Sequence, residues 1–170
     1  IEENDLDIAL ESSFVELFES IRLVRNLRAV AGLKPSQGAP VRFVTGKKAL
    51  AITLQNAKTD IRALTRATEL EVLDPTESAA KPVVKAIAGI SGELEVLLPI
   101  EGLVDLDSLS SRLEKDLAKA NKDILVFSNR LANPNFSEKA PPDVVAECKV
   151  KLAEVEVQAA LARKRLSDLT

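Results

Sequence analysis

The N-terminal part of the chain has the spacing of apolar positions that is typical of a helix. Apolar side chains recur every three or four residues, at Phe14, Leu17, Ile21, Val24, Leu27 and Ala31. This spacing predicts an amphipathic helix from Asp7 to Leu33. Asp5 or Asp7 is expected to cap its start, and Gly32 with a proline three residues later is a typical helix end.

The middle of the chain changes to the shorter period of strands. Four short apolar segments are read as strands: residues 41–46, 70–73, 83–90 and 93–100. The last two predict a hairpin that turns at Ser91 and Gly92. Residues 48–67 predict one helix, with an apolar side made of Leu50, Leu54, Ala57, Ile61 and Leu64. Residues 74–78 are read as a turn, and residues 37–101 together as a small α+β unit with three to four strands.

Two helical segments with a heptad-like apolar spacing follow, joined by a proline-rich loop. The first seam consists of Leu106, Leu113, Leu117, Ala120, Ile124, Phe127 and Leu131, with Ser110 in one polar slot. The second consists of Val145, Cys148, Leu152, Val155, Ala159, Ala162, Leu166 and Leu169. A short loop forces the two helices to run antiparallel. Pairing Glu114 with Arg163 and Asp123 with Lys151 would favour one register, although exposed pairs contribute only about 0.3–0.5 kcal/mol each.

We therefore predict an α+β protein with three regions along the chain. An N-terminal helix occupies residues 1–36, a small α+β unit residues 37–101, and a two-helix antiparallel coiled coil residues 102–170. The sequence contains no Met, not even at its start, from which we expect a piece of a longer chain.

Composition excludes several kinds of chemistry. The 23 Lys and Arg against 26 Asp and Glu give a net charge of −3, which rules out a uniformly basic nucleic-acid binder but not a local basic face. The absence of His removes Ser-His-Asp and Cys-His mechanisms and most zinc sites. We therefore expect no catalytic residue, metal or cofactor. The single Cys148 suits a reducing compartment and is expected to be a small core residue. No apolar run reaches the roughly 20 residues of a membrane span, so we expect a cytoplasmic protein without membrane contact.

Two sets of cations are candidates for binding the phosphates of RNA. The first is a basic stripe on the outward face of the first coil helix, formed by Arg112, Lys115, Lys119 and Lys122. The second set is Arg22, Arg25 and Arg28 in the N-terminal helix. The alternative for the stripe is a solubilising face paired with carboxylates such as Glu114 and Asp116. For the arginines it is favourable placement near a helix C-terminus.

Four aliphatic residues of the coil fall at positions that should face water: Val126, Val150, Val157 and Leu161. An exposed aliphatic stripe indicates packing against something else, such as the sugars of an RNA, another part of the protein, or a second copy of the chain.

Three motifs, in this order, carry a resemblance to one family. They are IRLVRNLRAVAGLKPSQGAPVRF from residue 21, ELEVLLPIEGLVDLD from residue 93, and the coil with its distinctive loop LANPNFSEKAPPDVV from residue 131. Together they resemble the C-terminal region of bacterial valyl-tRNA synthetases, a family of class I aminoacyl-tRNA synthetases.

The resemblance implies the last helix of an anticodon-binding domain, a linking α+β unit, and a coiled-coil arm that lies against tRNA. It also implies a whole enzyme that joins valine to its tRNA with ATP and magnesium and hydrolyses mischarged threonine. The class signatures HIGH and KMSKS are absent here, so this part is expected to be noncatalytic, with tRNA and the remaining domains as partners. The alternative is a structural coiled coil that associates domains or subunits without contacting RNA.

Overall fold

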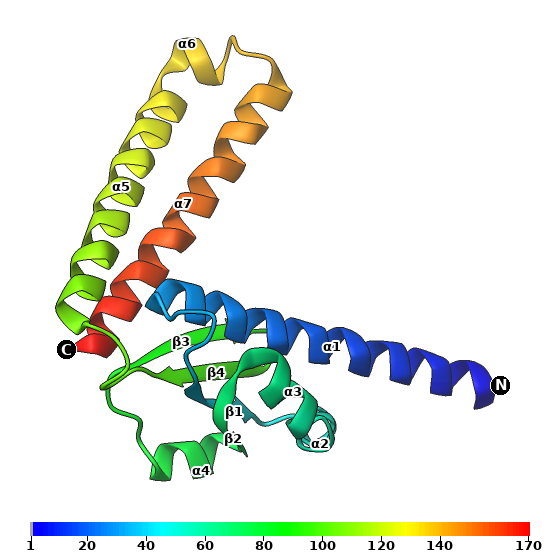
Figure 1. Ribbon diagram of the computed structural model, residues 1–170. Coiled ribbons are helices and arrows are strands. Elements are labelled where there is room, and N and C mark those ends of the chain that lie inside the picture. The colour runs from blue at the N-terminus through cyan, green and yellow to red at the C-terminus, as the bar shows by residue number, and fades with distance from the viewer. Residues whose placement is uncertain (1) are drawn as a thin grey trace. The chain divides into compact units, whose positions relative to one another are not determined.

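The computed structural model describes the backbone of residues 2–170 and the side chains of residues 11–170. It divides into two compact units, the first ending at Asp105 and the second running from Leu106 to Thr170. The first unit combines helices with a sheet and the second is helical, so the predicted α+β class is confirmed (Figure 1).

The first unit is a four-stranded sheet packed with helices. Its elements are α1 (Glu2–Ala31), β1 (Ala39–Thr45), α2 (Lys48–Asn56), α3 (Lys58–Thr65), β2 (Ala67–Leu73), α4 (Pro75–Ala80), β3 (Ala86–Ser91) and β4 (Leu94–Pro99). The strand order is β2-β1-β4-β3. β1 pairs with β2 in parallel, and the other two pairs are antiparallel. Because parallel strands need a crossover, α2 and α3 connect β1 to β2.

Helix α1 was predicted correctly at its end and wrongly at its start. It begins at Glu2, so Asp5 and Asp7 lie inside the helix rather than before its start. It ends at Ala31, followed by Gly32 with a φ of 74°. Most of the predicted apolar stripe is buried in the core, namely Ile21, Val24, Leu27 and Ala31. Phe14 was expected in that stripe but is 51% exposed, at an open hollow that it lines together with Thr53 and Asp60.

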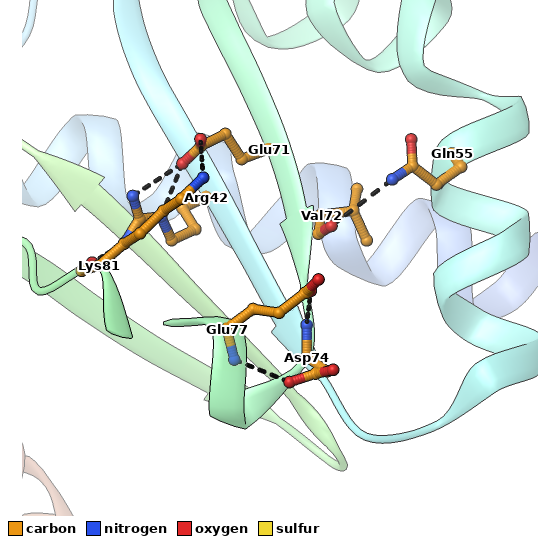
Figure 2. A network of polar contacts seen from close by, with 7 residues as sticks. All are labelled: Arg42, Gln55, Glu71, Val72, Asp74, Glu77 and Lys81. Carbon is orange, nitrogen blue, oxygen red and sulfur yellow. Dashed lines mark hydrogen bonds and ion pairs between the residues drawn. The ribbon is translucent and has the colours of Figure 1, made fainter. Parts of the chain in front are cut away.

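Two other predictions for this unit were wrong. The single helix expected at residues 48–67 is two helices that break at Ala57, and Leu64, expected on its apolar side, is 50% exposed. The turn expected at residues 74–78 is the short helix α4. Asp74 caps it by accepting from the backbone amides of Thr76 and Glu77. Figure 2 shows the bond from Glu77 and the return bond, in which the Glu77 carboxylate accepts from the Asp74 amide. The hairpin of β3 and β4 is confirmed, with Gly92 at a φ of 57°.

A polar clamp holds the connection between α4 and β3 against the sheet. Arg42 of β1 lies directly across from Glu71 of β2, and its Nε and Nη2 are 2.9 and 2.7 Å from one Glu71 oxygen. Arg42 also donates to the carbonyl of Lys81, just after α4 (Figure 2). Since side chains alternate along a strand, Arg42 points to the face opposite its fully buried neighbour Phe43.

The second unit is a two-helix arm. α5 (Leu106–Ala132) and α7 (Pro142–Leu169) run antiparallel, and the one-turn helix α6 (Pro134–Ser137) lies at their shared tip (Figure 1). Every predicted seam residue of both helices is buried or half-buried. Cys148 is a buried core residue as expected, and Leu109, which the prediction omitted, is almost fully buried.

The charge pairs expected across this arm were wrong. Arg163 donates to the side-chain oxygen of Asn121 at 2.9 Å instead of meeting Glu114. Lys151 pairs within its own helix, 2.7 Å from Glu147. Exposed charges on long side chains contribute too little energy to set the register, which the apolar seam sets instead.

Candidate nucleic-acid interface

Three lysines form an uncompensated stripe along α5. Lys115, Lys119 and Lys122 are exposed, and their spacing of four and three places them on one helix face. That face is turned away from the seam containing Leu113 and Ala120, which are buried. Among the residues whose side chains are described, none of the three lysines makes a hydrogen bond or an ion pair. The carboxylate pairing expected of a merely solubilising face is therefore not formed by these lysines.

Arg112 continues this stripe by one turn toward the start of α5. It is exposed, but unlike the lysines it interacts with another group of the chain. From Arg112 to Lys122 the stripe spans ten steps of the helix, or about 15 Å at 1.5 Å per residue. This length is sufficient for the side chains to reach several successive phosphates of a nucleic-acid backbone.

A groove of about 330 Å³ between α5 and α7 borders the stripe at Lys119. The charged side chains that line the groove are Asp116, Lys119, Asp123 and Arg165, so the lining has no net charge. The Nε of Arg165 is buried without a partner, and burial lowers the pKa of this guanidinium.

The cations of α7 are mostly engaged with neighbours. Lys151 lies 2.7 Å from Glu147 and Lys164 lies 3.0 Å from Asp168, each pair one turn apart. The hydrogen bond from Lys151 and its positive charge hold the pKa of Glu147 below its usual value. These lysines are therefore neutralised in a way that the stripe on α5 is not.

The three arginines predicted in α1 have separate surroundings rather than one shared face. Arg22 is exposed and pairs with Glu19 at 2.6 Å. Arg25 donates to the carbonyl of Leu64 through Nε and Nη2, at 3.3 and 3.2 Å. Arg28 is only 8% exposed and donates to two carbonyls of the loop that follows α1. Desolvation, and secondarily the charge of Arg66, lower the pKa of Arg28.

Sequence reasoning missed two further arginines beside this group. Arg62 donates to the carbonyls of Ala67 and Thr68, and Arg66 follows α3 in the left-handed conformation with a φ of 54°. They follow Arg25 of α1 by about 40 residues, and the sequence holds no local signal that the crossover through α2 and α3 brings them close to α1.

The aliphatic positions expected to face water on the arm do so. Val126, Val150 and Val157 are 53, 57 and 67% exposed, and Leu161 is exposed at the groove. Self-association through these positions stays a prediction, and sedimentation of the chain at high concentration would test it.

Two other kinds of site were searched for in the described part of the chain. It contains no group of three or more His, Cys, Asp or Glu side chains that could hold a metal ion. It also contains no helix that is long and apolar enough to cross a membrane.

Comparison with known proteins identifies the arm. Residues 105–170 match the family described as the valyl tRNA synthetase tRNA binding arm. This part of the chain belongs to that family.

The whole chain is similar to valine–tRNA ligases. It is 62% identical over all 170 residues to the valine–tRNA ligase of Parasynechococcus marenigrum (strain WH8102), of which it covers 19%. It is 62% identical over 164 residues, 96% of the chain, to that of Prochlorococcus marinus (strain MIT 9313), covering 17%. Over 166 residues, again 96% of the chain, it is 38% identical to that of Synechocystis sp. (strain ATCC 27184 / PCC 6803 / Kazusa), covering 18%. The chain thus spans about a fifth of the length of these relatives, and the resemblance to valyl-tRNA synthetases is confirmed.

Proposed function

We propose that this chain is the C-terminal, noncatalytic, tRNA-binding part of a valine–tRNA ligase, and that the stripe on α5 binds the tRNA backbone. The observation that carries the proposal is the row of exposed, unpaired lysines on an arm whose family is described as tRNA-binding. The uncompensated stripe favours this function over a structural coiled coil without RNA contact.

The stripe supplies affinity rather than sequence recognition. An ammonium group on a flexible stem attracts a phosphate oxygen and releases the counterions condensed on the RNA, so binding weakens steeply as salt rises. Phosphate contacts position an RNA without reading its bases. Discrimination for the valine tRNA is therefore expected from other parts of the whole ligase.

The whole protein proposed here attaches valine to its tRNA in the cytoplasm, using ATP and magnesium, and edits mischarged threonine. These steps require residues outside this chain. Within it, the arm and the first unit are proposed to hold tRNA and to connect with the remaining domains.

The experiment is a titration of labelled tRNA with the 170-residue chain, followed by fluorescence anisotropy at several salt concentrations. The double variant Lys115→Gln/Lys119→Gln should bind roughly tenfold to sixtyfold more weakly at 0.1 M salt, because each lost phosphate contact lowers the salt slope by about 0.9. The matched control is Lys151→Gln/Lys164→Gln, which removes the same charge from lysines that are already paired.

The control should keep most of the affinity, and both variants should keep the far-ultraviolet circular dichroism of the unaltered chain. Equal weakening in the two variants would mean that only net charge matters. Unchanged affinity of the Lys115→Gln/Lys119→Gln variant at low salt would contradict the proposal and favour the structural coiled coil.

A further inference from the structure

Four arginines gather around the turn between α3 and β2. Arg25 reaches it from α1 and donates to the Leu64 carbonyl, while Arg62 donates to the carbonyls of residues 67 and 68. Arg66 lies in the turn itself, and its carbonyl accepts from the amide of residue 39. Arg28 donates to the carbonyl of Gln37, which lies two residues before Ala39, and its charge interacts with that of Arg66. The four are called the arginine cluster below.

None of the carboxylates whose side chains are described forms an ion pair with this cluster. Among the side chains described, from residue 11 onward, none of its four arginines forms an ion pair, although Arg22 and Arg42 in the same unit do. Arg28 is more than nine-tenths buried, and its Nη1 has no hydrogen-bond partner. A buried guanidinium nitrogen without a partner is costly, so the fold retains here a positive charge that it does not compensate.

Hydrogen bonds to backbone carbonyls use only part of the N–H groups of these arginines. Arg25 and Arg62 each donate from Nε and Nη2 to backbone carbonyls, which leaves their Nη1 groups without a partner among the described residues. The side chain of Arg66 is exposed and makes no hydrogen bond to any described residue. Neutral carbonyls satisfy donors but do not balance charge, so the four positive charges stay without an ion-paired carboxylate among the described residues.

We infer that the arginine cluster is a second phosphate-binding site, which takes a backbone phosphate of RNA. It lies in the first unit, outside residues 105–170 that match the tRNA-binding arm. Guanidinium groups are weakly hydrated planar forks that suit phosphate oxygens, and all four cations here are arginines. The inference rests on the proposed tRNA binding for the source of the phosphate.

Arg66→Asn is the sharpest test of this site. Asn tolerates the left-handed conformation that Arg66 adopts, and no side-chain hydrogen bond is lost. Removing the charge also relieves its repulsion of Arg28, so amide hydrogen exchange should show a first unit that is as stable as in the unaltered chain or more stable. The affinity for tRNA should nevertheless fall roughly fivefold to eightfold at 0.1 M salt, with the salt slope reduced by about 0.9.

The matched control is Lys85→Asn. Lys85 is the other non-glycine residue at positive φ in the described chain, with a φ of 53°, and it lies outside the cluster. It loses the same charge in the same backbone conformation, so its tRNA affinity should stay within about twofold of that of the unaltered chain. Equal affinities of the Arg66→Asn and Lys85→Asn variants would overturn the second site.

Comparison with the lysine variants separates this inference from the proposed function. If Lys115→Gln/Lys119→Gln weakens binding and Arg66→Asn does not, the arm keeps its proposed function. The arginine cluster then does not bind RNA, and the inference is overturned. If only Arg66→Asn weakens binding, RNA binding by the arginine cluster is supported and RNA binding by the lysine stripe on α5 is contradicted. No binding of the unaltered chain to tRNA at low salt would overturn both.

Inorganic phosphate distinguishes an RNA phosphate from a free anion. The unaltered chain should bind tRNA equally well in phosphate and chloride buffers of the same ionic strength. A specific loss of affinity in phosphate that disappears in the Arg66→Asn variant would identify a site for the free anion and would overturn the assignment to RNA.

Discussion

Gly89 of β3 lies in close contact with two leucines of α1. A Cβ atom at Gly89 would lie 2.8 Å from the Cδ1 and 3.4 Å from the Cγ of Leu23, and 3.2 Å from the Cδ2 of Leu27. Cβ atoms in proteins essentially never approach another heavy atom to 2.8 Å. The substitution Gly89→Ala therefore tests directly whether α1 packs on β3 as the structure describes.

Two opposing effects decide the size of the change. Inserting a methyl group into a packed core costs about 1–3 kcal/mol, because the neighbours must leave their rotamers or shift. Replacing glycine inside a strand returns about 0.5–1 kcal/mol through the lower entropy of the unfolded chain. Leu23 is half-buried and can rotate, whereas Leu27 is fully buried and cannot move far. We expect Gly89→Ala to lower the free energy of unfolding of the first unit by about 1–2 kcal/mol.

Amide hydrogen exchange followed by NMR is the suitable assay. The chain has two compact units, so one global transition would not report the first unit separately. The slowest-exchanging amides of β1 and β4 give the free energy of opening of that unit directly. The matched control is Gly46→Ala, since a Cβ at Gly46 meets nothing within 4 Å and its φ is not positive.

The control should be as stable as the original chain, or more stable by about 0.4–1 kcal/mol. The double variant Leu23→Ala/Gly89→Ala should lose less stability than the two single variants added together, because the shortened side chain makes room for the new methyl group. If Gly89→Ala matches the control, or if the two substitutions simply add, the close packing of α1 on β3 is refuted.

Two smaller predictions concern a helix cap and a titrating pair. Asp74→Ala removes the acceptor for two backbone amides of α4 and should lower the protection of that segment by about 1 kcal/mol in the same exchange measurement; unchanged protection would contradict the capping role. Lys151→Gln should raise the pKa of Glu147 toward its ordinary value in an NMR titration, because Lys151 is the main cause of the lowering. A lowered carboxyl pKa contributes stability above the unfolded pKa and loses it as pH falls through the folded pKa, so the variant should be less sensitive to acid. An unmoved pKa of Glu147 would exclude this pairing in solution.

The arm could be predicted almost completely from the sequence. Its two seams repeat every three or four residues over many turns, and a pattern of that length has one structural solution when a short loop joins the helices. The stripe of Lys115, Lys119 and Lys122 followed from the same period, since it fixes which side chains lie opposite the seam. Even in the arm the predicted charge pairs were wrong, because Arg163 donates to Asn121 and does not pair with Glu114.

The first unit was predictable in its elements but less so in their details. The strands and the hairpin follow from local alternation and from Gly92 at the turn. The break at Ala57 has no glycine or proline to mark it, and the capping box at Asp74 is strong enough to turn an expected loop into a helix. Phe14 is exposed and Leu27 is buried although both belong to one apolar stripe, a difference that the helical period does not predict. The assignment of residues 1–36 to a separate anticodon-binding domain stays a prediction, and in this structure α1 packs on β3.

By itself, then, the sequence determined whatever depends on near neighbours: the helical and strand periods, the seams of the arm, its lysine stripe and the family resemblance. The tertiary structure alone decided which cations are free and which are neutralised. It buried Arg28 and paired Arg22 with Glu19, and it brought Arg66 beside Arg28. The physical reason is that electrostatic environment depends on distance in space, and a parallel crossover joins residues about 40 positions apart that no local pattern relates.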